Sequence, residues 1–247
     1  MQNINIAYAL QPLIVTIATF LFLAYFVRKK RFTKYVFIYT LLAYGIAIGA
    51  KAIFQTFTIG YVESYGNPYL LGIYYGLQTA IFEVGIAYLF ARYAASKKQI
   101  KIEEARAYGA GLAFWENGIL LGLFSLINLF SVYAVLGSTS PEAQVVYNTL
   151  MKSSPALFST SSSVLFTVFL GIVERTSSII IHYAWGILVV FAAVTRKKKY
   201  LLYALPMGLI DALVPFAKDI PLYYFEGFLF AIAVLALIFT LRITKKE

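Results

Sequence analysis

The chain has 247 residues, of which 61% are hydrophobic and only 13% charged, and its mean hydropathy is +0.77. A soluble domain carries about 25% charged residues, so the composition excludes an ordinary soluble protein and requires lipid to cover much of the surface. The absence of cysteine excludes disulfides and thiolate metal sites. The net charge of +10 lies in short clusters between apolar runs. Membrane topology produces that pattern, so we expect no nucleic-acid partner.

Long apolar runs dominate the chain, and a membrane-spanning helix needs about 20 such residues. They predict an all-α polytopic membrane protein, a bundle of about seven transmembrane helices in a single membrane-embedded domain over residues 1–247. The expected spans lie near residues 8–27, 35–56, 69–94, 107–135, 162–194, 200–217 and 222–243. Between the fourth and fifth, Ser140 and Pro141 suit the cap and first position of a short surface helix.

The basic residues show a strong bias toward one side of these spans, where seventeen of the 21 lie. They are Arg28, Lys29, Lys30, Arg31, Lys34, Arg92, Lys97, Lys98, Lys101, Arg106, Arg196, Lys197, Lys198, Lys199, Arg242, Lys245 and Lys246. The loops on the opposite side hold only Lys152 and Lys218. Because loops rich in Lys and Arg stay in the cytoplasm, we expect a multi-pass protein of a prokaryotic cell membrane. Its amino terminus would lie outside and its carboxyl terminus in the cytoplasm.

Ionisable side chains within spans are costly, so each is a candidate functional residue. They are Lys51, Glu83, Glu116, Glu174, Arg175, His182, Asp211 and Glu226. Lys51 and Glu83 lie at middle depth on neighbouring spans and are expected to pair for structural reasons. Glu226 lies near the outer end of the last span, where we expect it to reach the interface.

The fifth span carries the most suggestive pattern. Glu174, Ser178 and His182 are spaced i, i+4 and i+8, so they lie on one helix face, with Arg175 adjacent. His182 is the only histidine in the chain. A single histidine in a helix is usually a packing residue, but at membrane depth near a Glu–Arg pair it favours function. Glu174, Arg175 and Ser178 are expected to have supporting roles.

Two more candidates lie at the depth of this histidine. At 1.5 Å per residue, Glu116 lies about 14 Å, His182 about 18 Å and Asp211 about 17 Å from the cytoplasmic ends of their spans. Three such groups at one depth predict a buried site. A carboxylate in an apolar cavity can act as a general base near neutral pH, assisted by the histidine.

Three segments around these candidates resemble a known family. They are GAGLAFWENGIL at 109–120, VERTSSIIIHYAWGILVVFA at 173–192 and TRKKKYLLYALPMGLIDAL at 195–213. They resemble the YhfC family of intramembrane proteases, within the superfamily of CAAX prenyl endopeptidases and bacteriocin-processing enzymes. The resemblance covers about residues 105–215.

The resemblance implies a glutamic-type intramembrane endopeptidase. Glu116 would be the catalytic base, His182 its partner, and Asp211 the last motif position. Met207 stands where the superfamily has a histidine that stabilises the oxyanion, and Asn117 stands where it has a second glutamate. The loss of one oxyanion donor typically costs about 10²–10³ in rate, so Met207 leaves activity in question.

The chain is expected to bind neither a cofactor nor a metal, because one histidine with carboxylates is a poor set of zinc ligands. The expected partners are the lipid bilayer and a peptide or transmembrane segment of another membrane protein, which is compatible with a membrane complex.

Three functions stay open. The first is an intramembrane protease that cuts peptides with water activated by Glu116 and His182. The second is an inactive protease-like scaffold that binds a partner's transmembrane segment. The third is a small-molecule or proton-coupled carrier that uses Glu83, Glu116 and Asp211. A retinal protein is excluded, because the last span contains no lysine for a Schiff base. A Glu116–His182 separation within reach of a hydrogen bond or one water would favour the protease.

Overall fold

The computed structural model describes residues 3–159 and 163–245, and the regular elements in this part are all helical. Seven spans in it are long and apolar enough to cross a membrane. They are Ile6–Arg28, Lys34–Ser64, Pro68–Ser96, Ile102–Leu136, Val164–Thr195, Lys198–Asp219 and Leu222–Thr244. The expected fold class and number of spans are therefore confirmed. Residue 162, the first of the expected fifth span, lies outside the described residues.

Several spans are divided into segments of different helix type. In chain order the elements are η1 (Ile6–Ala9), α1 (Leu10–Arg28), α2 (Lys34–Ser64), α3 (Pro68–Gln78), η2 (Thr79–Gly85), α4 (Ile86–Ser96), η3 (Ile102–Glu104), α5 (Ala105–Ala113), η4 (Phe114–Leu123), α6 (Phe124–Leu136), α7 (Pro141–Ser153), η5 (Pro155–Phe158), α8 (Ser163–Thr195), α9 (Lys198–Gly208), η6 (Leu209–Asp219) and α10 (Leu222–Thr244). The segments η2 and η4 are π-helices, and η6 is a 3₁₀-helix. The third, fourth and sixth spans thus each change their winding within the membrane-spanning length.

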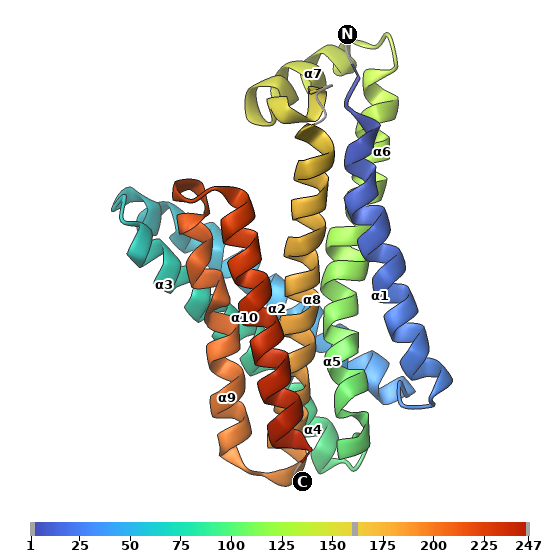
Figure 1. Ribbon diagram of the computed structural model, residues 1–247, viewed down its shortest axis with the longest axis vertical. Coiled ribbons are helices and arrows are strands. Elements are labelled where there is room, and N and C mark those ends of the chain that lie inside the picture. Colours follow the sequence, from blue (N-terminus) through green and yellow to red (C-terminus); the bar gives the residue numbers. More distant parts are fainter. Residues whose placement is uncertain (1–2, 160–162, 246–247) are drawn as a thin grey trace.

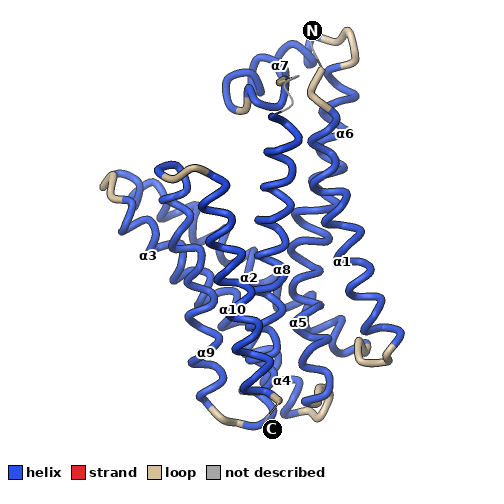
Figure 2. Tube along the Cα trace, viewed as in Figure 1, coloured by secondary structure: helices blue, strands red, loops and turns tan. Residues whose placement is uncertain are grey.

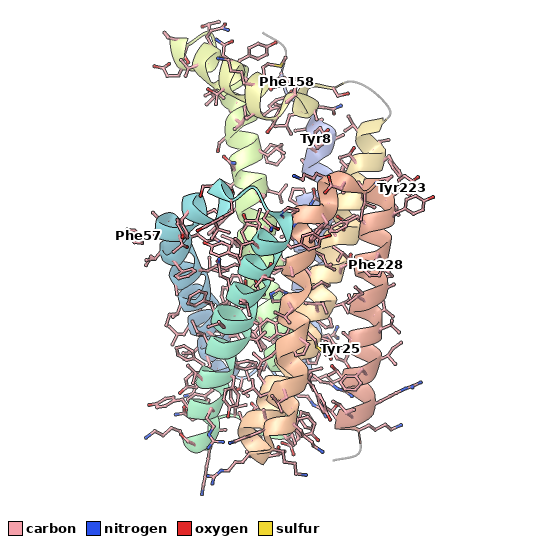
Figure 3. All side chains as sticks on the ribbon, turned by 90° about the vertical axis from the view of Figure 1, so that its left-hand side faces the viewer. Tyr8, Tyr25, Phe57, Phe158, Tyr223 and Phe228 are labelled. Carbon is pink, nitrogen blue, oxygen red and sulfur yellow. The ribbon has the colours of Figure 1, made fainter. Side chains whose placement is uncertain are left out.

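The helix α8 forms the centre of the bundle (Figure 1). It packs against α1, α4, α5, α9 and α10, which surround it. Its second half contributes fully buried side chains, among them Trp185, Leu188 and Val189. Aromatic side chains elsewhere face outward, such as Phe57 and Tyr223 (Figure 3), which are 81% and 48% exposed. This apolar outer surface is the one that lipid would cover.

The two ends of the bundle differ in character (Figure 2). The turns between α1 and α2, between α4 and η3 and between α8 and α9 lie at one end, together with the end of α10. These turns carry most of the basic clusters. The surface helix α7 lies at the other end, where Ser140 accepts a hydrogen bond from the Ala143 N–H and Pro141 takes the first turn. The expected surface helix is therefore confirmed.

Glycines allow α5 and α8 to come unusually close. A Cβ atom on Gly186 would lie 2.5 Å from Gly109 Cα, and one on Gly109 would lie 2.5 Å from the carbonyl oxygen of Tyr183. Small residues permit this approach of helices in membranes. Because η4 continues α5, this contact also places η4 beside α8.

We predict that Gly186→Ala destabilises the protein because the added methyl group overpacks the contact with Gly109. Overpacking of a core typically costs about 1–3 kcal/mol, which should lower the melting temperature of the purified protein measurably. Gly49→Ala is the matched control, since a Cβ there meets nothing within 4 Å and alanine favours a helix. Equal melting temperatures for the two variants would contradict the close contact.

Candidate functional site

A cavity of about 270 Å³ lies among α2, η2, η4, α8 and η6. Its polar lining consists of Lys51, Thr79, Glu83, Glu116, Glu174, Arg175, Ser177, Ser178, His182 and Asp211. The expectation that Glu116, His182 and Asp211 share one cavity is thus met, and their catalytic roles stay a prediction. The cavity brings together nearly all the ionisable groups of the spans, which is unusual for an apolar bundle.

Three of the four carboxylates that line this cavity come from irregular helical segments, and the fourth, Glu174, lies in α8. Glu83 lies in the π-helix η2, Glu116 in the π-helix η4 and Asp211 in the 3₁₀-helix η6, whereas His182 lies in the regular helix α8. A π-helical turn accommodates an extra residue and therefore rotates the side chains that follow it. Such turns occur frequently at functional sites. Regular helical geometry would not predict which faces of these spans carry the acids.

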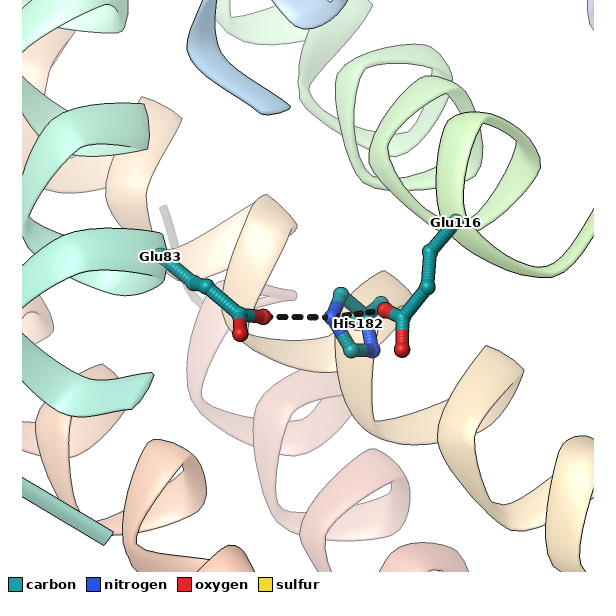
Figure 4. A group of neighbouring side chains, drawn as sticks. All are labelled: Glu83, Glu116 and His182. Carbon is teal, nitrogen blue, oxygen red and sulfur yellow. Dashed lines mark hydrogen bonds and ion pairs between the residues drawn. The ribbon is translucent and has the colours of Figure 1, made fainter. Parts of the chain in front are cut away.

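Two glutamates approach the imidazole of His182 from either side (Figure 4). The Nε2 atom lies 2.5 Å from Glu116 Oε2 and 3.1 Å from Glu83 Oε2. The side chains of His182 and Glu83 are 7% and 6% exposed. The Glu116 Oε2 atom is buried and accepts no well-formed hydrogen bond from the described residues, so its contact with the ring is essentially electrostatic.

The other ring nitrogen determines what Nε2 can do. The Nδ1 atom lies 2.9 Å from the carbonyl oxygen of Ser178. A carbonyl oxygen can only accept, so this contact requires a proton on Nδ1. In a neutral ring, Nε2 would then turn a lone pair toward two carboxylate oxygens. A proton on the ring or on one of the carboxyl groups, or a bound cation, would relieve this contact.

A second cluster surrounds the ammonium of Lys51. Its Nζ lies 2.7 Å from Glu83 Oε1, 2.8 Å from Thr79 Oγ1 and 3.5 Å from Asp211 Oδ2. The Thr79 hydroxyl donates to Asp211 Oδ2 at 2.5 Å. The structural pairing expected for Lys51 and Glu83 is therefore present. Asp211 lines the cavity but directs its carboxylate to this cluster, and Glu83 joins the two clusters.

The residues around His182 fit a divalent cation. One ligand atom each from Glu83, Glu116 and His182 can be chosen so that all three lie within 4.8 Å of one another. With Glu83, Glu116 and Asp211 ionised, Lys51 compensates only one of three negative charges in these clusters, and a divalent cation would compensate the other two. An imidazole with two carboxylates suits an ion such as Mn²⁺, whereas zinc sites usually have more nitrogen or sulfur ligands.

The expectation that the chain binds no metal rested on the single histidine, because one histidine with carboxylates is a poor set of zinc ligands. Sequence analysis assigned Glu83 to a structural pair with Lys51, and the structure adds a contact between Glu83 and His182. The only sequence signal for the contact between Glu83 and His182 was that Glu83 is an acid at membrane depth on a neighbouring span.

Two residues singled out by the resemblance lie outside the cavity lining. Asn117 is fully buried behind it and donates from Nδ2 to Ser178 Oγ at 3.1 Å, tying η4 to α8. Met207 lines a separate apolar groove with residues that include Pro206 and Phe239. The carboxylate expected beside Glu116 in the sequence is thus supplied in space by Glu83.

The remaining candidate residues from the sequence lie on α8 and α10. Arg175 is paired with its neighbour Glu174, and both line the cavity, as supporting residues would. Ser178 also lines it and connects Asn117 with the site. The expectation for Glu226 is wrong: it is only 4% exposed, because α10 packs closely against α8.

The fold and the site together define a multi-pass membrane protein with a buried carboxylate–histidine centre. The sequence matches the profile of the YhfC intramembrane metalloprotease family over residues 13–239, and the chain belongs to that family. It is also similar to the uncharacterized membrane protein YhfC of Bacillus subtilis (strain 168), with 29% identity over 146 residues. That match covers 58% of this chain and 55% of the relative. No solved structure matches the chain.

If the chain cleaves peptides as the resemblance implies, we predict that Met207→His leaves the cleavage rate within about twofold of wild type. An oxyanion donor acts only when it lies about 2.7–3.1 Å from the developing charge, and Met207 lines a different groove. The resemblance alone predicts the opposite, a gain of part of the about 10²–10³ that one donor contributes. Cleavage rates of the two proteins at equal concentration decide between them, and a gain of tenfold or more would overturn this placement.

Proposed function

We propose that this protein is a metal-dependent intramembrane endopeptidase that cuts peptides or transmembrane segments of other membrane proteins. The observation that carries the proposal is the 2.5 Å contact between Glu116 Oε2 and His182 Nε2 in a cavity between the spans. A base within hydrogen-bond reach of its partner is what water activation needs. The family's description as intramembrane metalloproteases supports the same reaction.

In this proposal Glu116 acts as the base. Its carboxylate accepts a proton from a water molecule while the water oxygen attacks the carbonyl carbon of the substrate. The carbon–nitrogen bond then breaks, and Glu116 returns the proton to the leaving amine nitrogen, which regenerates the carboxylate. His182 is held by its Nδ1–H bond to Ser178, so that Nε2 stays directed at Glu116.

Glu83, His182 and one oxygen of Glu116 would hold the metal, and the other oxygen of Glu116 would remain available to accept the proton. When bound there, a divalent cation would polarise the substrate carbonyl and make a bound water more acidic. The hydrogen bond from Nδ1 to a backbone carbonyl is the second contact that metal-binding histidines typically make. The apolar walls of the spans would exclude other water from the cavity.

An inactive scaffold and a proton-coupled carrier are the alternatives. A scaffold that docks a helix needs an apolar groove, and it gains nothing from several charges buried at high cost. A carrier needs acids along a path that solvent can reach, yet the side chains of Glu83 and Glu116 are only 6% and 15% exposed. Neither function requires two carboxylates to converge on one imidazole nitrogen.

We predict that Glu116→Gln lowers peptide cleavage by about 10²–10⁴, the usual contribution of a general base. The amide keeps the shape of the side chain but cannot take the proton from water. Purified wild type and variant would be incubated with membrane peptides in a buffer that contains Mn²⁺ or Zn²⁺. New peptide termini would be counted by mass spectrometry.

Glu142→Gln is the matched control for this experiment, because Glu142 lies exposed on α7 and undergoes the same chemical change. It should cut as fast as wild type. Removal of metal with EDTA should stop cleavage, and added Mn²⁺ or Zn²⁺ should restore it. Equal product from wild type and Glu116→Gln would exclude the catalytic role and leave the scaffold as the better reading.

We further propose that the end of the bundle with the basic turns faces the cytoplasm, which places the amino terminus outside. The chain contains no cysteine, so single cysteines can report their side of the membrane. On intact cells, an impermeant maleimide should label Thr139→Cys, beside α7, and should label Lys97→Cys only after permeabilisation. Labelling of both residues on intact cells would contradict this orientation.

A further inference from the structure

Each of the three N–H donors of the Lys51 ammonium has an acceptor nearby. It has three donors, and three different side chains offer acceptors at 2.7, 2.8 and 3.5 Å: Glu83, Thr79 and Asp211. The Thr79 oxygen accepts from Lys51 while its own proton goes to Asp211. Each of these hydrogen bonds therefore has a defined donor and acceptor. The side chains from α2, η2 and η6 form one ordered network.

This network divides the two oxygens of Glu83 between separate partners. Oε1 accepts from Lys51 at 2.7 Å, and Oε2 lies 3.1 Å from His182 Nε2. A carboxylate can otherwise rotate about its last bond, because the terminal torsion of glutamate is broad. The ammonium on one side selects the rotation that leaves the other oxygen facing the imidazole.

We propose that Lys51 is a positioning residue, which Thr79 and Asp211 hold in place and which fixes Glu83 as a ligand of the metal centre. The proposal rests on the metal-dependent reaction proposed above. It assigns Asp211 a role that differs from the one implied by the resemblance: Asp211 acts through Lys51. Outer partners of metal ligands typically contribute about 10–100-fold to metal affinity.

A purely structural ion pair is the competing explanation for Lys51. Such a pair would stabilise the contact between α2 and η2 and would have no effect at the imidazole. The network differs from that case because it ends on the carboxylate that contacts His182. A test therefore needs a signal from the histidine itself, and the chain provides one, since it contains a single histidine.

The experiment compares wild type with Lys51→Met and Thr79→Val, each purified in lipid nanodiscs and labelled with ¹⁵N in histidine. Two measurements are made: the ring ¹⁵N resonances of His182 without metal, and the affinity for Mn²⁺ by titration. Lys152→Met on α7 is the matched control, since it removes the same charge from an exposed position. Thr79→Val keeps the net charge, so it remains informative if Lys51→Met does not fold.

We expect Lys51→Met and, to a smaller extent, Thr79→Val to move the Nε2 resonance and to weaken Mn²⁺ binding by about 10–100-fold. Lys152→Met should change neither. In a Glu83→Gln background, Lys51→Met should add little further loss, because residues that act through one another are not additive. Unchanged His182 resonances in both variants, or full additivity with Glu83→Gln, would overturn the positioning role.

The failure of the two proposals can be told apart. If wild type binds no Mn²⁺ and cuts no peptide, the proposed metal-dependent function is wrong. The His182 resonances would still respond to Lys51→Met if Lys51 orients Glu83. If wild type binds Mn²⁺ and the Lys51 variants bind it equally well, the proposed function survives and the role of Lys51 is wrong.

Discussion

The architecture depends on how several carboxylates are held inside an apolar bundle. A charge in low-dielectric surroundings costs several kcal/mol unless it is paired, and lipid offers no partner. The protein meets this constraint for Glu83, Glu116 and Asp211 by collecting them around two nitrogen groups, the Lys51 ammonium and the His182 imidazole. Glu83 contacts both, through different oxygens. The two clusters are thereby coupled through one carboxylate.

The backbone is adapted to this purpose. Glu83, Glu116 and Asp211 come from segments wound as π- or 3₁₀-helix, and the central helix that carries the histidine is regular over its 33 residues. Glycines at 109 and 186 remove the side chains that would hold α5 and α8 apart. A close helix contact and a local change of winding together bring Glu116 onto His182.

The relation between motif and geometry is also informative. In the resemblance, the second carboxylate is expected next to Glu116 in the sequence, where this chain has Asn117. The structure places Asn117 behind the cavity and brings Glu83 from another span to the imidazole. A second carboxylate thus reaches the histidine from a different part of the chain. The groove that contains Met207 has no direct part in this contact.

The sequence by itself determined the membrane class, the all-helical fold, the seven spans and the residues that carry charge within them. These properties are local, since about 20 apolar residues define a span and a buried charge is conspicuous wherever it occurs. Depth counting also placed Glu116, His182 and Asp211 at one level. Only the tertiary structure decided which side chains meet. It gave Glu83 a contact with His182, directed Asp211 to Lys51 and buried Glu226 against α8. These outcomes depend on the rotation of each helix about its axis, which follows from changes of winding and from packing between distant segments, and no local pattern encodes it.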